Sequence, residues 1–351
     1  MADVLILGAG IIGCAVADTL ARRGARVRLI DPRGVGLGAT QASAGMLAPF
    51  TEGRHDRQMQ ALGVCSLERY GALIDRLRED GHEVAYSRLG SIDVAFDETR
   101  ARQLAGEANA LGADGVSHTF YEDDDARRFA PAVDSRVKAI LEIPAHGAVG
   151  VADLTAASAT RVAHARGAIR VETTCGVMDA PHVVLASGCW AGAVDLDGGA
   201  PLPVRPVRGQ LLALRLPSPA LAPTVWGPDC YLVPWSDGTV LVGATVEEAG
   251  FDEQATVAGV SGLLAAAPAL LPALSRATLL GVRVGLRPGT PDDRPVIGTS
   301  RRVPGLVYAT GHYRNGALLA PVTADIIGNL IEGREWDPSL NAFSPDRFGE
   351  Y

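Results

Sequence analysis

The sequence predicts a mixed fold, α/β combined with α+β, in which a parallel-sheet domain carries an inserted domain of antiparallel sheet. Three observations support this prediction. A strand, a glycine-rich turn, a helix and a second strand follow one another within residues 1–31. A strand ending in glycine and leading into a helix recurs over residues 306–331. Between these parts, residues 204–246 alternate between apolar and polar positions, which is the period of half-buried strands.

The N-terminal stretch has the order of a dinucleotide-binding unit. The apolar run Val4–Leu7 predicts a buried strand, and Gly8-Ala9-Gly10-Ile11-Ile12-Gly13 and a helix over Cys14–Arg23 follow it. Gly24 ends that helix, Val27–Ile30 is a second strand, and Asp31 comes directly after it. Because both strands, the helix and the acid accompany the G-x-G-x-x-G pattern, we interpret the unit as Rossmann-type rather than as an unrelated glycine-rich turn.

Each residue of this motif has its own expected role. Gly8 allows the tight turn, Gly10 lets a pyrophosphate approach the backbone, and Gly13 lets the helix pack on the sheet. The free N–H groups at the start of the helix favour the charge of a phosphate. Asp31 lies eighteen residues after Gly13, where it can accept hydrogen bonds from a ribose.

The composition excludes several classes of protein. The chain has 351 residues, which favours two domains. No apolar run reaches the roughly eighteen residues of a membrane span, and the sequence starts on a strand, so we expect no membrane span and no leader peptide. The net charge of −8 argues against a nucleic-acid partner. The 5 cysteines are scattered without metal-type spacing, which suits a reducing cytoplasm.

The remaining elements follow from periodicity and turn residues. Residues 32–49 form a loop of small residues, which suits a backbone lying against a flat ligand. We expect helices over residues 62–77, 99–111, from 122, from Asp153 as the N-cap to His164, 256–267 and 317–331. We expect strands over residues 90–96, 137–143, 183–188, 210–216, 230–234, 240–245, 281–286 and 306–310, with a hairpin turn at 236–238. The acidic run 122–125 is interpreted as a solvated helix start rather than a metal site.

This order of elements predicts a discontinuous architecture. Residues 1–80, 140–200 and 285–351 are expected to form the nucleotide-binding domain. Residues 81–139 and 201–284 are expected to form the inserted, substrate-binding domain.

Three stretches together carry a family resemblance: the N-terminal motif with Gly38–Pro49, the segment Gly285–Asp292 and the segment Gly311–Pro321. On these residues the chain resembles the superfamily of FAD-dependent amino-acid oxidases that includes D-amino-acid oxidase and sarcosine oxidase. It is most similar to the glycine oxidases of thiamine biosynthesis. The resemblance covers nearly the whole chain, and it implies a Rossmann-type FAD-binding domain with an inserted antiparallel-sheet substrate domain.

The resemblance also implies which residues form the site. Arg287 and Arg314 would hold a substrate carboxylate, and Tyr231 would add a hydroxyl group to it. Because no cysteine lies in the C-terminal flavin segment, FAD is expected to be bound non-covalently. The residues expected to bind FAD are Gly8, Gly10, Ile11, Ile12, Gly13, Asp31, Pro32, Ala39, Thr40, Ala44, Gly45, Met46, Gly176 (to the adenine), His312, Tyr313, Arg314, Asn315, Gly316, Ala317 and Leu318.

The residue types fit these roles, and alternatives stay open on the sequence alone. Arg287 follows an apolar strand, where a guanidinium group needs either a substrate carboxylate or a structural carboxylate at a domain interface. Arg314 could contact a phosphate, and Tyr231 could be a core residue. We interpret His312 as a residue that packs on or hydrogen-bonds the flavin, because hydride transfer from a neutral amine needs no general base.

The sequence departs from the family pattern at three places. Residues 172–181 leave little room for the hairpin that the family usually has before the strand at Val183, so none is expected. Trp235 stands where the family has a polar residue, and Val246 stands where it often has methionine. Both residues are expected near the mouth of the pocket.

These observations predict a cytoplasmic, FAD-dependent oxidase of a small amino acid, with glycine as the expected substrate. The imine product would hydrolyse to glyoxylate and ammonia or enter thiazole synthesis, and O2 would be reduced to H2O2. The expected partners are the amino acid, O2 and further copies of the chain in a homo-oligomer. The alternatives are a D-amino-acid or sarcosine dehydrogenase with another electron acceptor, an NAD(P)-binding reductase, and a non-catalytic flavin-binding protein.

Overall fold

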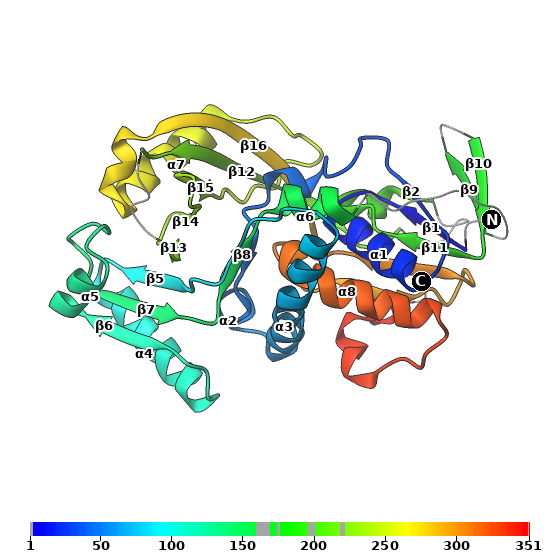
Figure 1. The fold of residues 1–351 in the computed structure, drawn as a ribbon, viewed down its shortest axis with the longest axis horizontal. Helices are drawn as coiled ribbons and strands as arrows, with labels where there is room; N and C mark the ends of the chain where they lie inside the picture. Colours follow the sequence, from blue (N-terminus) through cyan, green and yellow to red (C-terminus); the bar gives the residue numbers. More distant parts are fainter. Residues whose placement is uncertain (1–2, 159–168, 174–175, 196–200, 218–221, 350) are drawn as a thin grey trace.

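The computed structural model describes residues 3–158, 169–173, 176–195, 201–217, 222–349 and 351 (Figure 1). Its α-helices are α1 Ile11–Arg22, α2 Pro49–Glu52, α3 Arg57–Glu79, α4 Glu98–Ala113, α5 Asp123–Phe129, α6 Val151–Ser158, α7 Val257–Leu270 and α8 Gly316–Ile331. Its 3-10 helices are η1 Ala39–Ala42, η2 Gly188–Ala193, η3 Pro272–Arg276, η4 Pro338–Phe343 and η5 Pro345–Phe348. Its strands are β1 Val4–Leu7, β2 Val27–Ile30, β3 Met46–Leu47, β4 Tyr86–Ser87, β5 Ser91–Ala95, β6 Thr119–Glu122, β7 Ala139–Ile143, β8 Gly147–Val149, β9 Ile169–Thr173, β10 Gly176–Ala180, β11 His182–Leu185, β12 Arg205–Arg215, β13 Thr224–Trp226, β14 Tyr231–Pro234, β15 Thr239–Gly243, β16 Thr278–Gly289, β17 Val296–Thr299 and β18 Leu306–Thr310.

A five-stranded sheet of order β17-β18-β11-β1-β2 forms the right-hand part of the molecule in Figure 1. Strand β1 pairs in parallel with β2 and β11, and β11 pairs in parallel with β18. Strand β17 runs antiparallel to β18. These strands come from three distant segments of the chain, and they confirm the Rossmann-type sheet that the sequence predicts.

An eight-stranded sheet of order β16-β12-β15-β14-β13-β5-β7-β6 forms the left-hand part. Its neighbours pair antiparallel, except β13 and β5, which run parallel. The sheet therefore confirms the largely antiparallel second part of the predicted fold. It includes all of β7, which ends at Ile143, and all of β16, which ends at Gly289. It thus extends past residues 139 and 284, where the sequence analysis placed the limits of the inserted domain.

Two small sheets complete the fold. A three-stranded sheet of order β3-β8-β4 lies next to the end of the small-residue loop. Strands β9 and β10 pair antiparallel, with Ile169 opposite Ala180 and Thr173 opposite Gly176. The expectation that residues 172–181 leave little room for a hairpin is therefore wrong, because β9 already begins at Ile169, before that stretch.

Several element limits differ from the sequence analysis for identifiable reasons. Helix α3 begins at Arg57 because the Asp56 side chain caps it, accepting from the N–H groups of Gln58 and Met59. The sequence analysis placed the start of this helix at residue 62, because the apolar residues with helical spacing begin there. Asp153 lies inside the first turn of α6 rather than at its N-cap, and the expected helix end at His164 lies outside the described residues.

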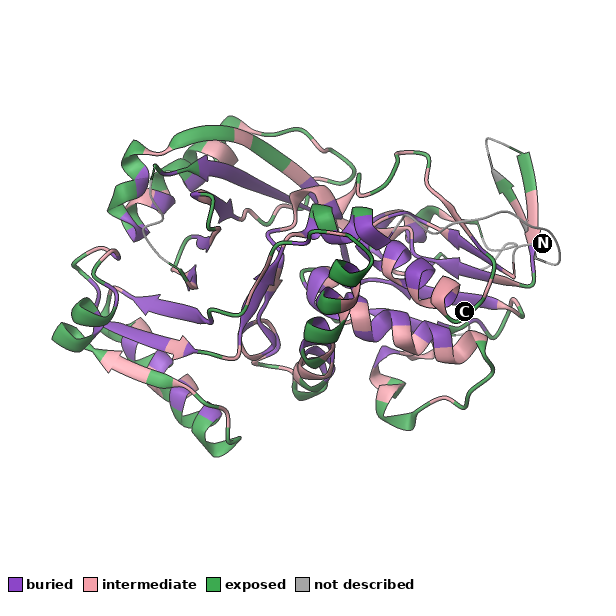
Figure 2. Ribbon diagram, viewed as in Figure 1, coloured by how far each residue is buried: buried purple, intermediate pink, exposed green. Residues whose placement is uncertain are grey.

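Each of the two large sheets has its own buried cluster, and Figure 2 shows buried residues in both parts of the molecule. The first packs the five-stranded sheet against α1, α3 and α8, with Val16, Tyr70 and Ile327 among its members. The Tyr70 hydroxyl donates to the carbonyl oxygen of Ala317, which ties α3 to α8 inside this cluster. The second packs α7 on the eight-stranded sheet, with Leu212 and Leu263 among its members.

Two further properties concern membranes and metals. No helix in the described ranges is long and apolar enough to cross a membrane. Within the same ranges, no group of three or more His, Cys, Asp or Glu side chains is placed to hold a metal ion. In the acidic run, Asp124 and Asp125 pair with Arg127 and Arg128 on α5.

Candidate active site

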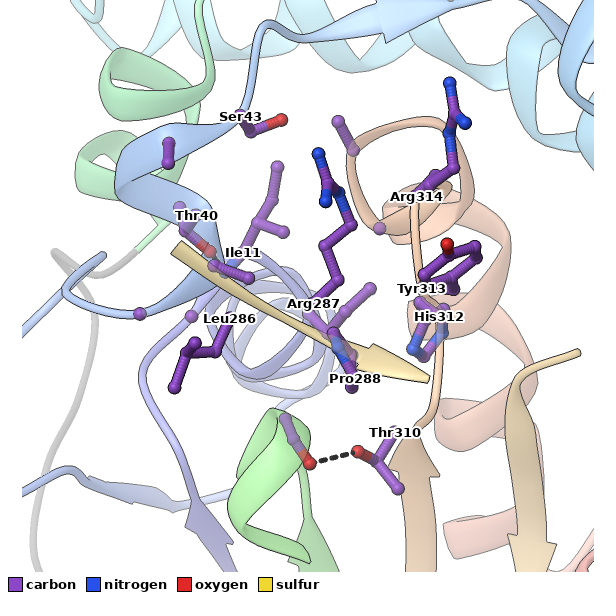
Figure 3. A pocket seen from close by; sticks show the side chains of 18 of the residues that line it. Ile11, Thr40, Ser43, Leu286, Arg287, Pro288, Thr310, His312, Tyr313 and Arg314 are labelled. Carbon is purple, nitrogen blue, oxygen red and sulfur yellow. Dashed lines mark hydrogen bonds between the residues drawn. The ribbon is translucent and has the colours of Figure 1, made fainter. Parts of the chain in front are cut away.

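A cavity of about 890 Å³ runs from the turn between β1 and α1 to the ends of β14 and β16. This volume is near the upper end of the roughly 300–1,000 Å³ typical of ligand pockets. Figure 3 shows that its lining comes from segments far apart in the sequence, including Ile11, Thr40, Arg287 and Tyr313. The two sheets thus share one binding site between them.

The turn between β1 and α1 forms one end of the cavity. Gly8 has a φ of +111°, and a Cβ atom there would lie 2.4 Å from the carbonyl oxygen of Ala186. A Cβ atom on Gly13 would lie 1.9 Å from the carbonyl oxygen of Gly8, so this glycine lets α1 start against the turn. The N-cap residue of α1 is Gly10, which has no side chain, and the first turn holds no acidic residue. An anion in the cavity would therefore meet a favourable helix dipole.

Asp31 lies at the same end, where β2 finishes. Its Oδ2 accepts a hydrogen bond of 2.8 Å from the N–H of Ala9, and its Oδ1 accepts one of 2.8 Å from the N–H of Arg33. Arg33 pairs with Glu253 at 2.8 Å, and its guanidinium carbon lies 4.7 Å from the centre of the Trp190 ring. These contacts fix the Asp31 carboxylate at the cavity wall.

The small-residue loop after β2 lies along the cavity and contains η1. The Thr40 Oγ1 accepts a hydrogen bond of 3.0 Å from the N–H of Ile11, which holds the loop on the start of α1. Gly45 has a φ of +76°, and a Cβ atom there would lie 1.9 Å from the carbonyl oxygen of Val149. Small side chains therefore let this backbone lie between β8 and the cavity.

Arg287 enters the other end of the cavity from β16. Its Nη1 donates to the carbonyl oxygens of Thr245 at 3.0 Å and Arg208 at 3.3 Å. A Cβ atom on Gly209 would lie 2.3 Å from Nη2, so the guanidinium group occupies the space that this glycine leaves. Among the described residues, no carboxylate forms an ion pair with Arg287, and burial lowers the pKa of its guanidinium group. A ligand anion would stabilise this cation.

Tyr231 lies beside Arg287 on the strand β14. A Cβ atom on Gly243 would lie 2.3 Å from the Tyr231 hydroxyl oxygen, so the ring lies over the neighbouring strand where a side chain is missing. Burial raises the pKa of Tyr231 to about 12, and Arg287 and Arg314 act in the opposite direction. The hydroxyl group is therefore protonated at neutral pH and can donate a hydrogen bond to an anion.

Arg314 reaches the cavity from the segment before α8. Its Nη2 lies 3.1 Å from Oε1 of Glu52, the last residue of α2. The preceding Tyr313 has a φ of +46°, which is uncommon for a residue with a side chain, and its N–H donates to the carbonyl oxygen of Pro288 at 3.0 Å. This bond joins the two arginine-bearing segments, and Figure 3 shows both guanidinium groups extending toward the same side of the cavity.

His312 is buried in the cavity wall. Its Nε2 lies 3.0 Å from the Thr323 Oγ1 on α8, and burial lowers the pKa of its imidazole to about 3. The ring is therefore neutral at physiological pH. The hydrogen bond to Thr323 orients the ring within the segment that leads into α8.

Most of the residues expected at the site line this one cavity. They are Gly8, Gly10, Ile11, Ile12, Asp31, Pro32, Ala39, Thr40, Ala44, Gly45, Met46, Tyr231, Arg287, His312, Tyr313, Arg314, Gly316 and Ala317. Gly13, Gly176, Asn315 and Leu318 do not line it.

The residues outside the lining have other surroundings. Asn315 is the N-cap residue of α8, and Leu318 is buried in the cluster between α1, α3 and α8. Gly176 is exposed on β10, whereas Val171 and Glu172 on β9 line the cavity in its place.

Trp235 was expected at the mouth of the pocket, but it packs against the cluster that contains Tyr231 and does not line the cavity. Val246 does line the cavity, and it is exposed.

The profile of the family described as FAD dependent oxidoreductase matches residues 3–330. The chain belongs to this family. FAD is its cofactor, as the sequence analysis predicts.

Similar proteins cover nearly the whole chain. It is 33% identical to a glycine oxidase of Geobacillus kaustophilus over 98% of this chain and 97% of the relative. It is 35% identical to a bifunctional protein ThiO/ThiG of Synechocystis sp. over 99% of this chain and 54% of the relative, so the chain spans about half the length of that protein. The crystal structure of the glycine oxidase from Geobacillus kaustophilus has a TM-score of 0.93 at 32% identity and covers 98% of both chains.

The cavity of this member of the FAD dependent oxidoreductase family fits the cofactor. The start of α1, with a glycine N-cap and no acidic residue in its first turn, suits a pyrophosphate, and the fixed carboxylate of Asp31 suits a ribose. The Ser187 Oγ is buried in the lining without a hydrogen-bond partner among the described residues, which marks a polar group that a ligand can satisfy.

The cavity residues that the sequence analysis did not assign to the site include Glu52, Ser187 and Trp226. The Trp226 Nε1 is buried and has no hydrogen-bond partner within the described ranges. Ser187 follows β11, and the carboxyl ends of parallel strands in such a sheet face the ligand, so its position could have been found. Nothing in the pattern around Glu52 or Trp226 indicates a site.

Proposed function

We propose that this chain catalyses the FAD-dependent oxidation of glycine, or of an amino acid of similar size, at its C–N bond. Glycine, O2 and water would give glyoxylate, ammonia and H2O2. The similarity to glycine oxidases over nearly the full chain supports this assignment, and the similarity to ThiO/ThiG proteins supports a role in thiamine thiazole synthesis. The proposal includes a cytoplasmic, homo-oligomeric enzyme that binds FAD non-covalently.

One observation carries the proposal: Arg287 is a half-buried cation in the cavity whose hydrogen bonds go to two carbonyl oxygens. A substrate carboxylate would supply the missing anion, and the protonated Tyr231 hydroxyl group would donate a further hydrogen bond to it. These two contacts would bind the substrate by its carboxylate and hold its Cα–N bond in a fixed orientation.

The other residues would bind and shield the cofactor. The β1–α1 turn, Asp31 and the loop around Thr40 would hold the dinucleotide part, and the segment His312–Ala317 would lie along the flavin. Bound FAD would supply the two-electron oxidant for the reaction. Because His312 is neutral and bonded to Thr323, we assign it an orienting role and no proton transfer.

The products of turnover test this function. Purified holoenzyme incubated with glycine in air should consume O2 and form glyoxylate, ammonia and H2O2 in equal amounts. Glyoxylate formed only with an added quinone or dye, and no O2 uptake, would assign a dehydrogenase instead. Faster turnover of D-phenylalanine than of glycine would show that the glycine assignment is wrong.

A further inference from the structure

Arg287 and Arg314, which the sequence analysis expects at the substrate carboxylate, share the lining of the cavity with Glu52, which it did not assign to the site. Of the two arginines, Glu52 pairs with Arg314 alone. Among these three side chains, one positive charge is left without a carboxylate partner, and it belongs to Arg287. We propose that Glu52 is a specificity-determining residue that restricts the substrate to a single carboxylate by neutralising Arg314.

The position of Glu52 is fixed by the elements around it. Its side chain is 13% exposed and that of Arg314 is 34% exposed, so the pair lies at the wall of the cavity rather than in open solvent. Helix α2 is held by the N–H of Phe50, which donates to the His146 Nε2 at 3.2 Å. Just after α2, Arg54 pairs with the buried Asp93 on β5 at 3.3 Å. Contacts of the residues before and after Glu52 in the chain therefore hold it next to Arg314.

Electrostatics connects this pair with Arg287. The charge of Arg314 lowers the pKa of Arg287, and the charge of Glu52 raises it, so both groups are within range of the carboxylate-binding cation. Tyr231 also faces this end and is uncharged at neutral pH, because burial raises its pKa to about 12. Arg287, Arg314 and Glu52 together therefore carry a net charge of +1, which one substrate carboxylate would neutralise.

A second carboxylate on the substrate would have no free cation. It would have to displace Glu52 from Arg314 or lie beside the Glu52 carboxylate, and both arrangements are unfavourable. Replacing Glu52 by a neutral isostere removes this negative charge and frees the Arg314 guanidinium group. The variant should then accept an amine that carries two carboxylates.

The inference rests on the proposed function, and a pair of matched substrates tests it. Iminodiacetate and its monoamide have nearly the same shape and differ by one negative charge. For Glu52→Gln, the ratio of kcat/KM for iminodiacetate to that for the monoamide should rise by about tenfold or more over the parent, because one charge-assisted contact is gained. Glu52→Asp keeps the charge and should keep the ratio close to that of the parent.

A control and a double variant separate this effect from a general change in charge or stability. Glu248 pairs with Arg205 at the same distance of 3.1 Å and lies outside the cavity, so Glu248→Gln should leave the ratio unchanged. In Glu52→Gln/Arg314→Gln the gain should disappear, because the second cation is absent.

Equilibrium binding gives a readout that does not depend on turnover. Diglycolate has two carboxylates and no amine, and methoxyacetate is its counterpart with one carboxylate. Calorimetry on the holoenzyme should show tighter binding of diglycolate to Glu52→Gln than to the parent, with little change for methoxyacetate. Equal changes for both ligands, or an unchanged ratio of substrates in a variant that still oxidises glycine, would overturn the inference. A parent enzyme that does not oxidise glycine at all would contradict the proposed function instead.

Discussion

At the scale of single residues, the site depends on positions where side chains are missing as much as on those that are present. Gly209 leaves the space that the guanidinium group of Arg287 fills, and Gly243 leaves the space for the Tyr231 hydroxyl group. Both glycines lie on strands of the eight-stranded sheet next to the strand that carries the functional side chain. The sheet itself therefore sets the direction in which the two side chains reach the cavity.

Arg287 provides the first test at this scale. Arg287→Ala should lower kcat/KM for glycine about a hundredfold or more, because two hydrogen bonds to a charged group contribute roughly 1.5–3 kcal/mol each. Arg287→Lys should recover part of the loss, since it keeps the charge and loses the forked geometry. Steady-state kinetics measures both effects.

The control for this test lies on the same strand. Arg283 is exposed on β16 and does not line the cavity, so Arg283→Ala should leave kcat/KM unchanged. Flavin content and Tm should stay close to the parent in all three variants. A large loss of FAD or of Tm in Arg287→Ala would instead show that Arg287 stabilises the fold.

The sequence identifies some of these residues and misses others for a physical reason. Arg287 and Tyr231 lie on strands with a readable pattern and in segments that resemble a known family. Glu52 ends a helix of a single turn, and its partner Arg314 is 262 residues away. An ion pair between two loop-like segments leaves no periodicity in the sequence, so only the structure brings them together.

At the scale of elements, α2 shows how a short helix can be positioned by its neighbours. The His146 Nε2 accepts from the N–H of Phe50, and its Nδ1 lies 2.7 Å from the Ser91 Oγ on β5. The Phe50 and His146 rings also stack, with centroids 5.7 Å apart. This pattern needs a neutral imidazole with its proton on Nδ1, and burial lowers the pKa of His146 to about 3.

This histidine predicts a pH dependence of stability. Between pH 6.5 and about 3, the unfolded chain binds a proton at His146 that the folded chain does not bind. Stability should therefore fall as the pH drops below about 6.5, by on the order of 2 kcal/mol at pH 5 from this group. The free energy of unfolding at pH 7.5 and pH 5, measured by denaturant titration, should show a smaller fall in His146→Gln than in the parent.

The half-buried His118 supplies the comparison. His118→Gln should keep the pH dependence of the parent, because His118 bonds only to the nearby carbonyl of Val116 among the described contacts. A His146→Gln variant with the same fall in stability as the parent would show that His146 does not hold α2 as a neutral ring.

The element limits show what periodicity can and cannot predict. Strands β1, β2 and β18 begin and end where the sequence analysis placed them, since each is a largely apolar run next to a glycine or an acid. The hairpin of β9 and β10 was missed, because Gly176–Ala180 lacks a buried face and carries no strong alternation. The edge strand β6 was missed for the same reason, as its residues are partly or fully exposed.

At the scale of the whole molecule, the cavity lies between two sheets that come from interleaved segments of the chain. The five-stranded sheet supplies the nucleotide motif and the segment before α8, and the eight-stranded sheet supplies Tyr231 and Arg287. Strand β16 ends beside the Tyr313 backbone, so the substrate-binding cation and the segment expected to lie along the flavin are joined directly. The class of fold could be predicted because the strands of each sheet have a recognisable pattern of apolar residues in the sequence. The contact between β16 and the Tyr313 backbone could not be predicted, because it joins segments without such a pattern.

The most direct test of the central claim is an anaerobic titration of the oxidised holoenzyme, followed by flavin absorbance. Glycine should bleach the flavin completely, and methylamine, which has no carboxylate, should bleach it far more slowly at the same concentration. In Arg287→Ala the advantage of glycine over methylamine should largely disappear. Flavin that stays oxidised with glycine, or that is bleached equally by both amines in the parent, would contradict an amino-acid oxidase that binds its substrate by the carboxylate at Arg287.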